Sequence, residues 1–199
     1  MLIGVCPAYL PNIHYMAWVV SQIEIVMVTN KPYQKQTFRN RSEIYGANGK
    51  LKLTIPIVHS KEKERQIDET VVIHYENSWQ QKHWKSLENA YRSSPFFEFY
   101  EDDLYPFYHQ KFEKLMDYNI ELIKMVLHLL NSKVKLLFNE ETDDDFDDLI
   151  IAKHGLKKKT PLYQQVFQFK HGFISNLSIL DLLFNLGPQS LEYLKKVNR

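Results

Sequence analysis

Two short apolar runs separated by a helical pattern begin the chain and constrain its fold more than any other feature. The runs are residues 2–6, ended by Pro7, and residues 24–29. Between them, Asn12 is placed to cap a helix over residues 13–22. Continuous apolar runs of this length indicate strands buried on both faces, as in a parallel sheet. The order strand, helix, strand predicts a βαβ unit with a right-handed crossover, and hence an α/β fold.

Open α/β sheets bind their ligands beyond the carboxyl ends of the parallel strands. Residues 7–12 leave one of those ends here, and a polar stretch, residues 33–48, follows the second strand. This stretch carries Lys35, Arg39 and Arg41 among amides and aromatic side chains. A protein core cannot hold such cations without partners, and guanidinium groups bind phosphate or carboxylate with two parallel hydrogen bonds. The stretch therefore predicts one wall of a pocket for an anionic, hydroxyl-rich ligand.

The same cations also fit a solvated strand or loop that pairs with acidic side chains elsewhere. Residues 139–148 supply such acids, and residues 153–159 form a basic run. We expect both runs to be exposed, and residues 139–159 to be a flexible stretch of the chain.

The remaining pattern predicts one domain, residues 1–199, in which residues 1–76 are mainly α/β and residues 77–199 mainly helical. Residues 46–49 are expected to form a turn and residues 60–70 a loop. Ser78 with Gln81, and Ser178 with Asp181, have the spacing of capping boxes. Further strands are predicted at 51–58, 71–75 and 134–138, and helices from Ser78, at 96–108 with a turn at Pro106, at 112–131, within 172–187, and at 189–196.

The best candidate for an acid–base group is His83. It shares a predicted helix face with Trp79 and Tyr91, and histidine titrates near neutral pH, as a general base requires. A hydrogen-bonded core histidine among aromatic rings is the alternative interpretation. Cys6, at a strand end, is expected to be a small buried packing residue rather than a nucleophile.

Composition excludes several classes of protein. The net charge of +1 argues against a general nucleic-acid binder, so no DNA partner is expected. A single cysteine excludes an internal disulfide and suits a reducing compartment, which favours the cytoplasm. The histidines are scattered without metal-ligand spacing, and no metal or cofactor is expected. No apolar run is long enough to span a membrane, and the start lacks the positive region of a signal peptide.

Several motifs, in order along nearly the whole chain, resemble the WbqC-like protein family. They are Tyr9-Leu-Pro11, Tyr33-Gln-Lys-Gln-x-x-Arg39-Asn-Arg41, Gly46-Ala-Asn48-Gly49, Trp79-x-x-x-His83-Trp84, Ala90-Tyr91-x-x-Ser94-Pro95-Phe-Phe, and a closing Phe173-Ile-x-Asn-Leu-Ser-Ile-Leu-Asp-Leu-Leu. The departure is at the start. Cys6 stands where many relatives have Gln, and His14-Tyr15-Met16 replaces Gly-Tyr-Phe, so a role of that Gln does not transfer.

The resemblance implies a bacterial protein associated with lipopolysaccharide synthesis, particularly of O-antigen. The strand–proline turn–helix opening also looks like nucleotidyl-transferase-type folds. It implies a Rossmann-like, three-layer N-terminal part followed by a helical C-terminal part. The alternative of a tRNA-linked aminoacyl transferase has the near-neutral net charge against it.

The leading hypothesis is a transferase-like enzyme (glycosyl, acyl or aminoacyl) that binds an activated anionic donor. A nucleotide-sugar, or another phosphorylated or carboxylated small molecule, is the expected substrate. Its anionic group would contact Lys35, Arg39 and Arg41, and His83 would be the catalytic base. The remaining contacts would come from amides that read hydroxyls and from aromatic faces: Gln34, Gln36, Asn40, Asn48, Tyr9, Tyr33 and Trp84.

The rival hypothesis is a non-catalytic binding or scaffold protein of the same pathway. It would use residues 96–108 and the C-terminal helices as an interface, for example in a homodimer. It predicts an exposed apolar patch, and internal salt bridges that hold Arg39 and Arg41.

Overall fold

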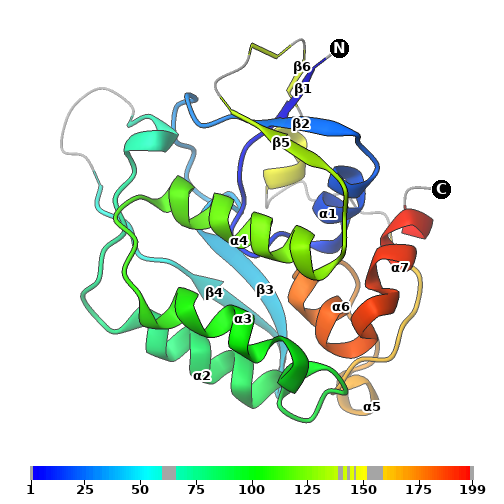
Figure 1. Ribbon diagram of the computed structural model, residues 1–199. Coiled ribbons are helices and arrows are strands. Elements are labelled where there is room, and N and C mark those ends of the chain that lie inside the picture. Colours follow the sequence, from blue (N-terminus) through cyan, green and yellow to red (C-terminus); the bar gives the residue numbers. More distant parts are fainter. Residues whose placement is uncertain are drawn as a thin grey trace.

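A computed structural model describes residues 2–59, 66–138, 141–142, 144–145, 147–151 and 159–197. Its central sheet has four strands in the order β5-β2-β1-β6, and all neighbouring pairs run parallel (Figure 1). The strands are β1 (Ile3–Val5), β2 (Glu24–Met27), β5 (Lys135–Leu137) and β6 (Asp144–Asp145). Helix α1 (Ile13–Val20) connects β1 to β2. The predicted α/β fold, with a βαβ unit and a parallel sheet, is confirmed.

The predicted cap of α1 is also confirmed. Asn12 has extended backbone angles (φ −74°, ψ 168°), and its side chain accepts a hydrogen bond of 2.9 Å from the Tyr15 amide. This bond satisfies one of the free amides at the start of the helix. Val5 of β1 and Ile25 of β2 are fully buried, as the apolar runs indicated.

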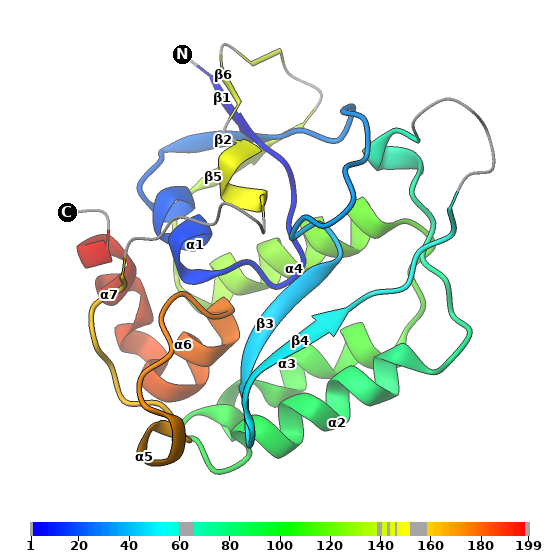
Figure 2. The same cartoon turned by 180° about the vertical axis from the view of Figure 1, so that it is seen from behind.

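The predicted turn at residues 46–49 is the tip of an antiparallel hairpin, which Figure 2 shows beside α2. Its strands are β3 (Arg41–Gly46) and β4 (Gly49–Thr54), and Gly46 pairs with Gly49. Gly49 has a φ of +97°, a conformation that L-amino acids rarely adopt and the achiral glycine adopts freely. The polar stretch 33–48 thus supplies a regular strand, β3, that the sequence left undecided.

Two strand predictions need correction. The strand expected at 51–58 ends at Thr54, since Pro56 lacks the amide for a further ladder bond. Residues 71–75 form no strand; Val72 and Ile73 make only isolated bridges, to Lys114 and Ile57. The loop expected at 60–70 contains a 3₁₀ turn, η1 (Asp68–Thr70), and residues 60–65 lie outside the described part.

The acidic stretch contributes a strand, because β6 pairs with β1. The rest of residues 139–159 lies partly outside the described residues, and so does most of the basic run 153–159.

The helices follow the apolar periodicity closely. They are α2 (Trp79–Tyr91), α3 (Phe97–His109), α4 (Leu115–Leu129), α5 (Gln168–His171), α6 (Ile179–Leu186) and α7 (Ser190–Val197), with 3₁₀ turns η2 (Asp147–Ile150) and η3 (Gly187–Gln189). The turn predicted at Pro106 is wrong: α3 continues through it. Pro106 lies in the last helical turn, where its missing amide removes only one ladder bond.

Of the two predicted capping boxes, the first is wrong and the second is confirmed only for its serine. Ser78 takes a left-handed conformation (φ 49°, ψ 42°) and makes no side-chain cap, so the capping box there is wrong. Ser178 does cap α6, since its hydroxyl accepts from the Leu180 amide. Asp181, however, points into the core and accepts hydrogen bonds from the Tyr91 and Tyr163 hydroxyls.

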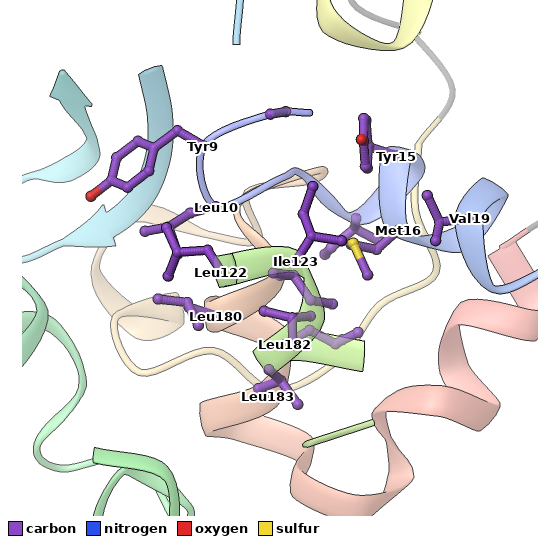
Figure 3. Close-up of a cluster of buried hydrophobic side chains, with 14 of the residues drawn as sticks. Tyr9, Leu10, Tyr15, Met16, Val19, Leu122, Ile123, Leu180, Leu182 and Leu183 are labelled. Atoms are coloured by element: carbon purple, nitrogen blue, oxygen red, sulfur yellow. The ribbon is translucent and has the colours of Figure 1, made fainter. Parts of the chain in front are cut away.

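The main core joins the two parts of the chain. Figure 3 shows side chains of α1, α4 and α6 meeting, among them Met16, Ile123 and Leu183, all fully buried. In Figures 1 and 2, α1 and α4 both lie below β2 and β5. No helix of the described residues is long and apolar enough to cross a membrane.

Candidate functional site

The candidate site lies where the chain leaves the carboxyl ends of β1 and β2. Cys6 follows β1, and η1 docks on the segment that follows β2. In this docking, the Asp68 amide donates to the Lys31 carbonyl (2.8 Å) and the Glu69 amide donates to the Thr29 carbonyl (2.9 Å). Backbone hydrogen bonds therefore bring the start of η1 to the edge of the sheet where α/β folds bind ligands.

A buried ion pair lies at this edge. The Arg39 Nε atom is 2.9 Å from both carboxylate oxygens of Asp68. The exposed fractions are 1% for Arg39 and 0% for Asp68. Sequence reasoning missed Asp68, which stands in a charged segment expected to form a loop. The only available signal was that a buried arginine requires a carboxylate, and this does not say which one.

Asn119 of α4 ties this pair to the strand ends. Its Nδ2 atom donates to the Arg39 carbonyl (2.7 Å) and to the Pro7 carbonyl (3.2 Å). The Cys6 thiol lies 3.4 Å from the Asp68 carboxylate and is fully buried, as expected for a packing residue. The segments after β1 and β2 are thus held to each other and to α4.

Tyr33 lies within electrostatic range of both the ion pair and Arg41. Burial raises the pKa of the half-buried Tyr33 to about 12; the charges of Arg39 and Arg41 act against this shift, and that of Asp68 adds to it. The hydroxyl of Tyr33 therefore keeps its proton at neutral pH and can donate a hydrogen bond. All three charged groups act electrostatically on this one phenol, which places Arg41 with the Arg39–Asp68 pair.

Arg41 differs from Arg39 in its partners. Its Nε atom is buried and makes no hydrogen bond, and no carboxylate of the described residues pairs with its guanidinium group. Buried polar nitrogens almost always have a partner, so this one requires an explanation. A guanidinium group whose hydrogen-bonding capacity is not used within the protein is suited to bind an anion.

The other residues of the polar stretch that were predicted to bind the ligand lie in separate places: in the segment before Thr37, at Asn40, and in the hairpin turn. Gln34, Lys35 and Gln36 are exposed in the segment before Thr37. Asn40 is buried, and its Nδ2 atom donates to the Ile55 carbonyl at 2.9 Å. Asn48 lies in the hairpin turn, whereas Arg41 pairs with Thr54 at the other end of the hairpin. At about 3.3 Å per residue, the strand separates Asn48 from Arg41 by roughly 20 Å.

His83 belongs to a buried aromatic group. Its Nδ1 atom is 2.8 Å from the Tyr9 hydroxyl, which is in turn 3.1 Å from the Tyr108 hydroxyl. Burial lowers the pKa of His83 from 6.5 to about 4, although a backbone hydrogen bond at Thr54 acts in the opposite direction. The imidazole is therefore neutral at pH 7. Trp84 packs between α2 and α3, where its ring contacts that of Tyr105.

The two groups meet at the loop after β1. The Tyr9 amide donates to the Phe38 carbonyl (2.9 Å), and the Tyr9 ring stacks on that of Tyr118. The Tyr9 hydroxyl contacts His83, while Asn119 binds Pro7 in the same loop. Residues 7–9 thus connect the buried His83 to the ion pair at the sheet edge.

No group of three or more His, Cys, Asp or Glu side chains in the described ranges is arranged to hold a metal ion. The candidate site is therefore built from one buried ion pair, a second guanidinium group, a protonated phenol and amides.

Comparisons with known proteins agree with the sequence motifs. Residues 6–153 and 139–193 match the WbqC-like protein family. The chain is also similar to "Uncharacterized protein Rv1507c" from Mycobacterium tuberculosis (strain ATCC 25618 / H37Rv), with 25% identity over an alignment of 226 positions that covers 94% of each chain. No solved structure matches the chain. Because the family match extends over most of its length, the chain belongs to the WbqC-like protein family.

Proposed function

We propose that this protein is a transferase-like enzyme that binds an activated anionic donor at the carboxyl ends of β1 and β2. One observation carries the proposal: the Arg41 Nε atom is buried and has no hydrogen-bond partner among the described residues. A phosphate or carboxylate would supply that partner. The Tyr33 hydroxyl, protonated at neutral pH, would donate a second hydrogen bond to the same group.

The charged side chains of the candidate site favour a bound anion. Arg39 and Asp68 compensate each other, whereas no carboxylate of the described residues pairs with Arg41. In a partly buried site such a charge attracts an anion more strongly than it would in water. The exposed Lys35, between Gln34 and Gln36, would extend the site towards solvent and meet the outer part of the donor.

The remaining predicted residues have different roles in the proposal. Asn40 orients the hairpin through its bond to Ile55. His83, through Tyr9, holds the loop that carries Pro7, and any proton transfer by this imidazole would pass through the Tyr9 hydroxyl. Asn48 and Trp84 would contact only an acceptor that extends well beyond the anion site.

The finer parts of the proposal rest on the family resemblance. They are a Rossmann-like, nucleotidyl-transferase-like N-terminal part within one domain, a nucleotide-sugar or acyl donor, and a place in bacterial O-antigen synthesis in the cytoplasm. The parallel βαβ unit supports the first, as does β5, which brings a strand from the C-terminal part into the same sheet.

A second candidate is a non-catalytic scaffold protein that forms a homodimer. The observations that favour it are the Arg39–Asp68 ion pair and large exposed aromatic side chains. Phe99 of α3 is 73% exposed and Phe169 of α5 is 97% exposed. Sedimentation tests this candidate: it requires a concentration-dependent dimer that Phe99→Ser or Phe169→Ser weakens.

Calorimetric titration with a panel of nucleotide-sugars tests the enzyme proposal. We expect Arg41→Ala to weaken binding by about 10- to 100-fold, because a charge-assisted bond to the donor is lost. Tyr33→Phe should weaken it by less. Arg92→Ala, which removes an exposed arginine of α2 paired with Glu88, is the matched control and should bind as wild type does.

Two outcomes would overturn the proposal. One is a wild-type protein that binds no member of the panel. The other is an Arg41→Ala variant that binds as tightly as the Arg92→Ala control. Arg39 is unsuitable for this test, because its removal would leave Asp68 buried without its partner.

A further inference from the structure

A pocket lies at the opposite end of the sheet from the candidate site, away from the carboxyl ends of the strands. Its volume is about 460 Å³, within the usual range for small-molecule sites. It lies between the end of α1, the start of β2, the segment from α4 to β5, and α7. Figure 1 shows α7 next to α1 on this side of the molecule.

One part of the lining is apolar. Val20, Ile23, Val134 and Leu191 contribute to it from separate segments of the chain. Ile23 is 84% exposed, although it directly precedes a buried strand. A ligand with an aliphatic part would remove this surface from water, which is favourable in proportion to the apolar area covered.

The other part is polar. Three consecutive residues, Asn131, Ser132 and Lys133, supply most of it, and Gln22 and Lys195 supply the rest. The backbone of the three consecutive residues is fixed. The Ser132 amide donates to the Leu127 carbonyl at 2.9 Å, and Asn131 takes the left-handed conformation that ends α4 (φ 53°). Lys135 next to them bonds through its amide to the Ile23 carbonyl at 3.0 Å, which holds this segment against the apolar part.

The side chains of these three residues are left available. None of them forms a side-chain hydrogen bond or an ion pair with the described part of the chain. Lys195, the other cation of the lining, pairs with Glu192 at 2.7 Å. The lining within the described ranges contains no carboxylate. Among the described residues, Lys133 is thus an ammonium group that no carboxylate neutralises, in a lining that also offers an amide and an aliphatic surface.

A lysine just after a helix also offsets the negative end of the helix dipole, and this accounts for the charge of Lys133 alone. It does not account for a pocket whose lining combines that lysine, Asn131 and Ser132 with an exposed isoleucine.

We propose that this pocket binds an amphipathic organic anion, with a carboxylate or phosphate monoester at Asn131–Lys133 and an aliphatic chain along Val20, Ile23 and Leu191. The ammonium group supplies the charge, while the amide and the hydroxyl donate hydrogen bonds to the anionic oxygens. This site is separate from Arg41, at the other end of the parallel strands, and does not depend on the function proposed there.

The test uses the whole protein and four probes of eight carbon atoms each: octanoate, octyl phosphate, octanol and octylamine. Binding is followed by shifts of backbone amide signals in nuclear magnetic resonance titrations. We expect both anions to bind and to shift signals of residues 131–134, with octanol weaker and octylamine weakest. The ratio of the octanoate and octyl phosphate affinities identifies the preferred head group.

Binding measurements on variants then test where the anionic group and the aliphatic chain of the ligand bind. Lys133→Glu should weaken octanoate binding by about tenfold or more, because an attraction becomes a repulsion. Ile23→Ser should weaken all four probes. Lys135→Glu makes the same charge change at a neighbouring exposed lysine outside the lining, and should leave octanoate binding within about twofold of wild type.

The proposal is overturned if none of the probes binds, or if octanol binds as well as octanoate. It is equally overturned if Lys135→Glu weakens octanoate as much as Lys133→Glu does, since that would show a general charge effect. The changed side chains are all exposed, so the variants should fold, and their circular dichroism spectra check this.

Discussion

The Nε atom of Arg39 is equidistant, at 2.9 Å, from the two carboxylate oxygens of Asp68, and both side chains are excluded from solvent. The pair links the segment that leads into β3 to the start of η1. A buried ion pair stabilises a fold only weakly compared with a well-packed apolar pair, but the loss of one partner leaves an uncompensated charge. This asymmetry gives a measurable signature.

We expect Arg39→Met and Asp68→Asn each to reduce the free energy of unfolding by about 3–5 kcal/mol. The double variant should lose clearly less than the sum, since neither charge remains. Urea denaturation of the four proteins gives the coupling energy. Arg92→Met, at an exposed pair with Glu88, is the control and should change stability by at most about 1 kcal/mol. Additive losses in the double variant would contradict the buried pair.

A pH dependence follows from His83. Its pKa in the folded protein is about 4, below the ordinary value of 6.5, because the imidazole is buried. Between these values the unfolded chain binds a proton that the folded protein does not. The stabilisation is therefore complete above pH 6.5 and is lost as the pH falls towards 4, by up to about 3 kcal/mol.

The variant His83→Gln removes the titrating group and keeps a polar partner for Tyr9. The difference in unfolding free energy between wild type and this variant should become smaller as the pH is lowered from 7 to 4. A direct check is the ring-proton signal of His83, which should titrate near pH 4. A midpoint near 6.5 would show that the imidazole is solvated.

Two glycines with positive φ angles allow the cost of backbone strain to be distinguished from the cost of crowding. Gly187 (φ +53°) and Gly172 (φ +73°) would both be strained as alanine. A Cβ atom at Gly187 would lie 2.6 Å from the Phe96 ring, whereas one at Gly172 would meet nothing within 4 Å.

We expect Gly172→Ala to cost about 1–3 kcal/mol from backbone strain alone, because its φ of 73° with ψ of −175° is a combination essentially restricted to glycine. Gly187→Ala should cost about 1–3 kcal/mol more, because the Phe96 ring must also move. Thermal denaturation of the two variants gives the difference. Equal losses of stability in the two variants would mean that the Phe96 ring moves without cost. Such a result would contradict the predicted effect of crowding at Gly187.

The sequence predicted those features that depend on neighbouring residues. The apolar runs at 2–6 and 24–29 became β1 and β2, and Asn12 capped α1 because a cap needs only a suitable side chain at one position. Strand β3 was hidden by its composition. Ser42, for example, is buried because its hydroxyl donates to the Leu10 carbonyl, a partner far away in the chain.

The sequence could predict where the candidate site would lie, but not which contacts its side chains make. The topological rule for α/β sheets pointed to the segments after β1 and β2, and Arg39, Arg41 and Tyr33 do gather there. Which arginine is neutralised depends on Asp68, and its approach is set by the tertiary fold. The choice between a catalytic and a buried His83 likewise depended on its packing, which lowers its pKa.

The position of β5 has a consequence for synthesis of the protein. Val26 of β2 pairs with Leu137, so the partner of an early strand is made late. A chain growing from its N-terminus therefore presents one unpaired edge of β2 while α2, α3 and α4 are still being made. Unpaired edges recruit other strands, and long-range pairing slows folding. The nascent protein is thus exposed to misassembly for most of its elongation, and a fragment that stops before residue 135 should be prone to aggregate.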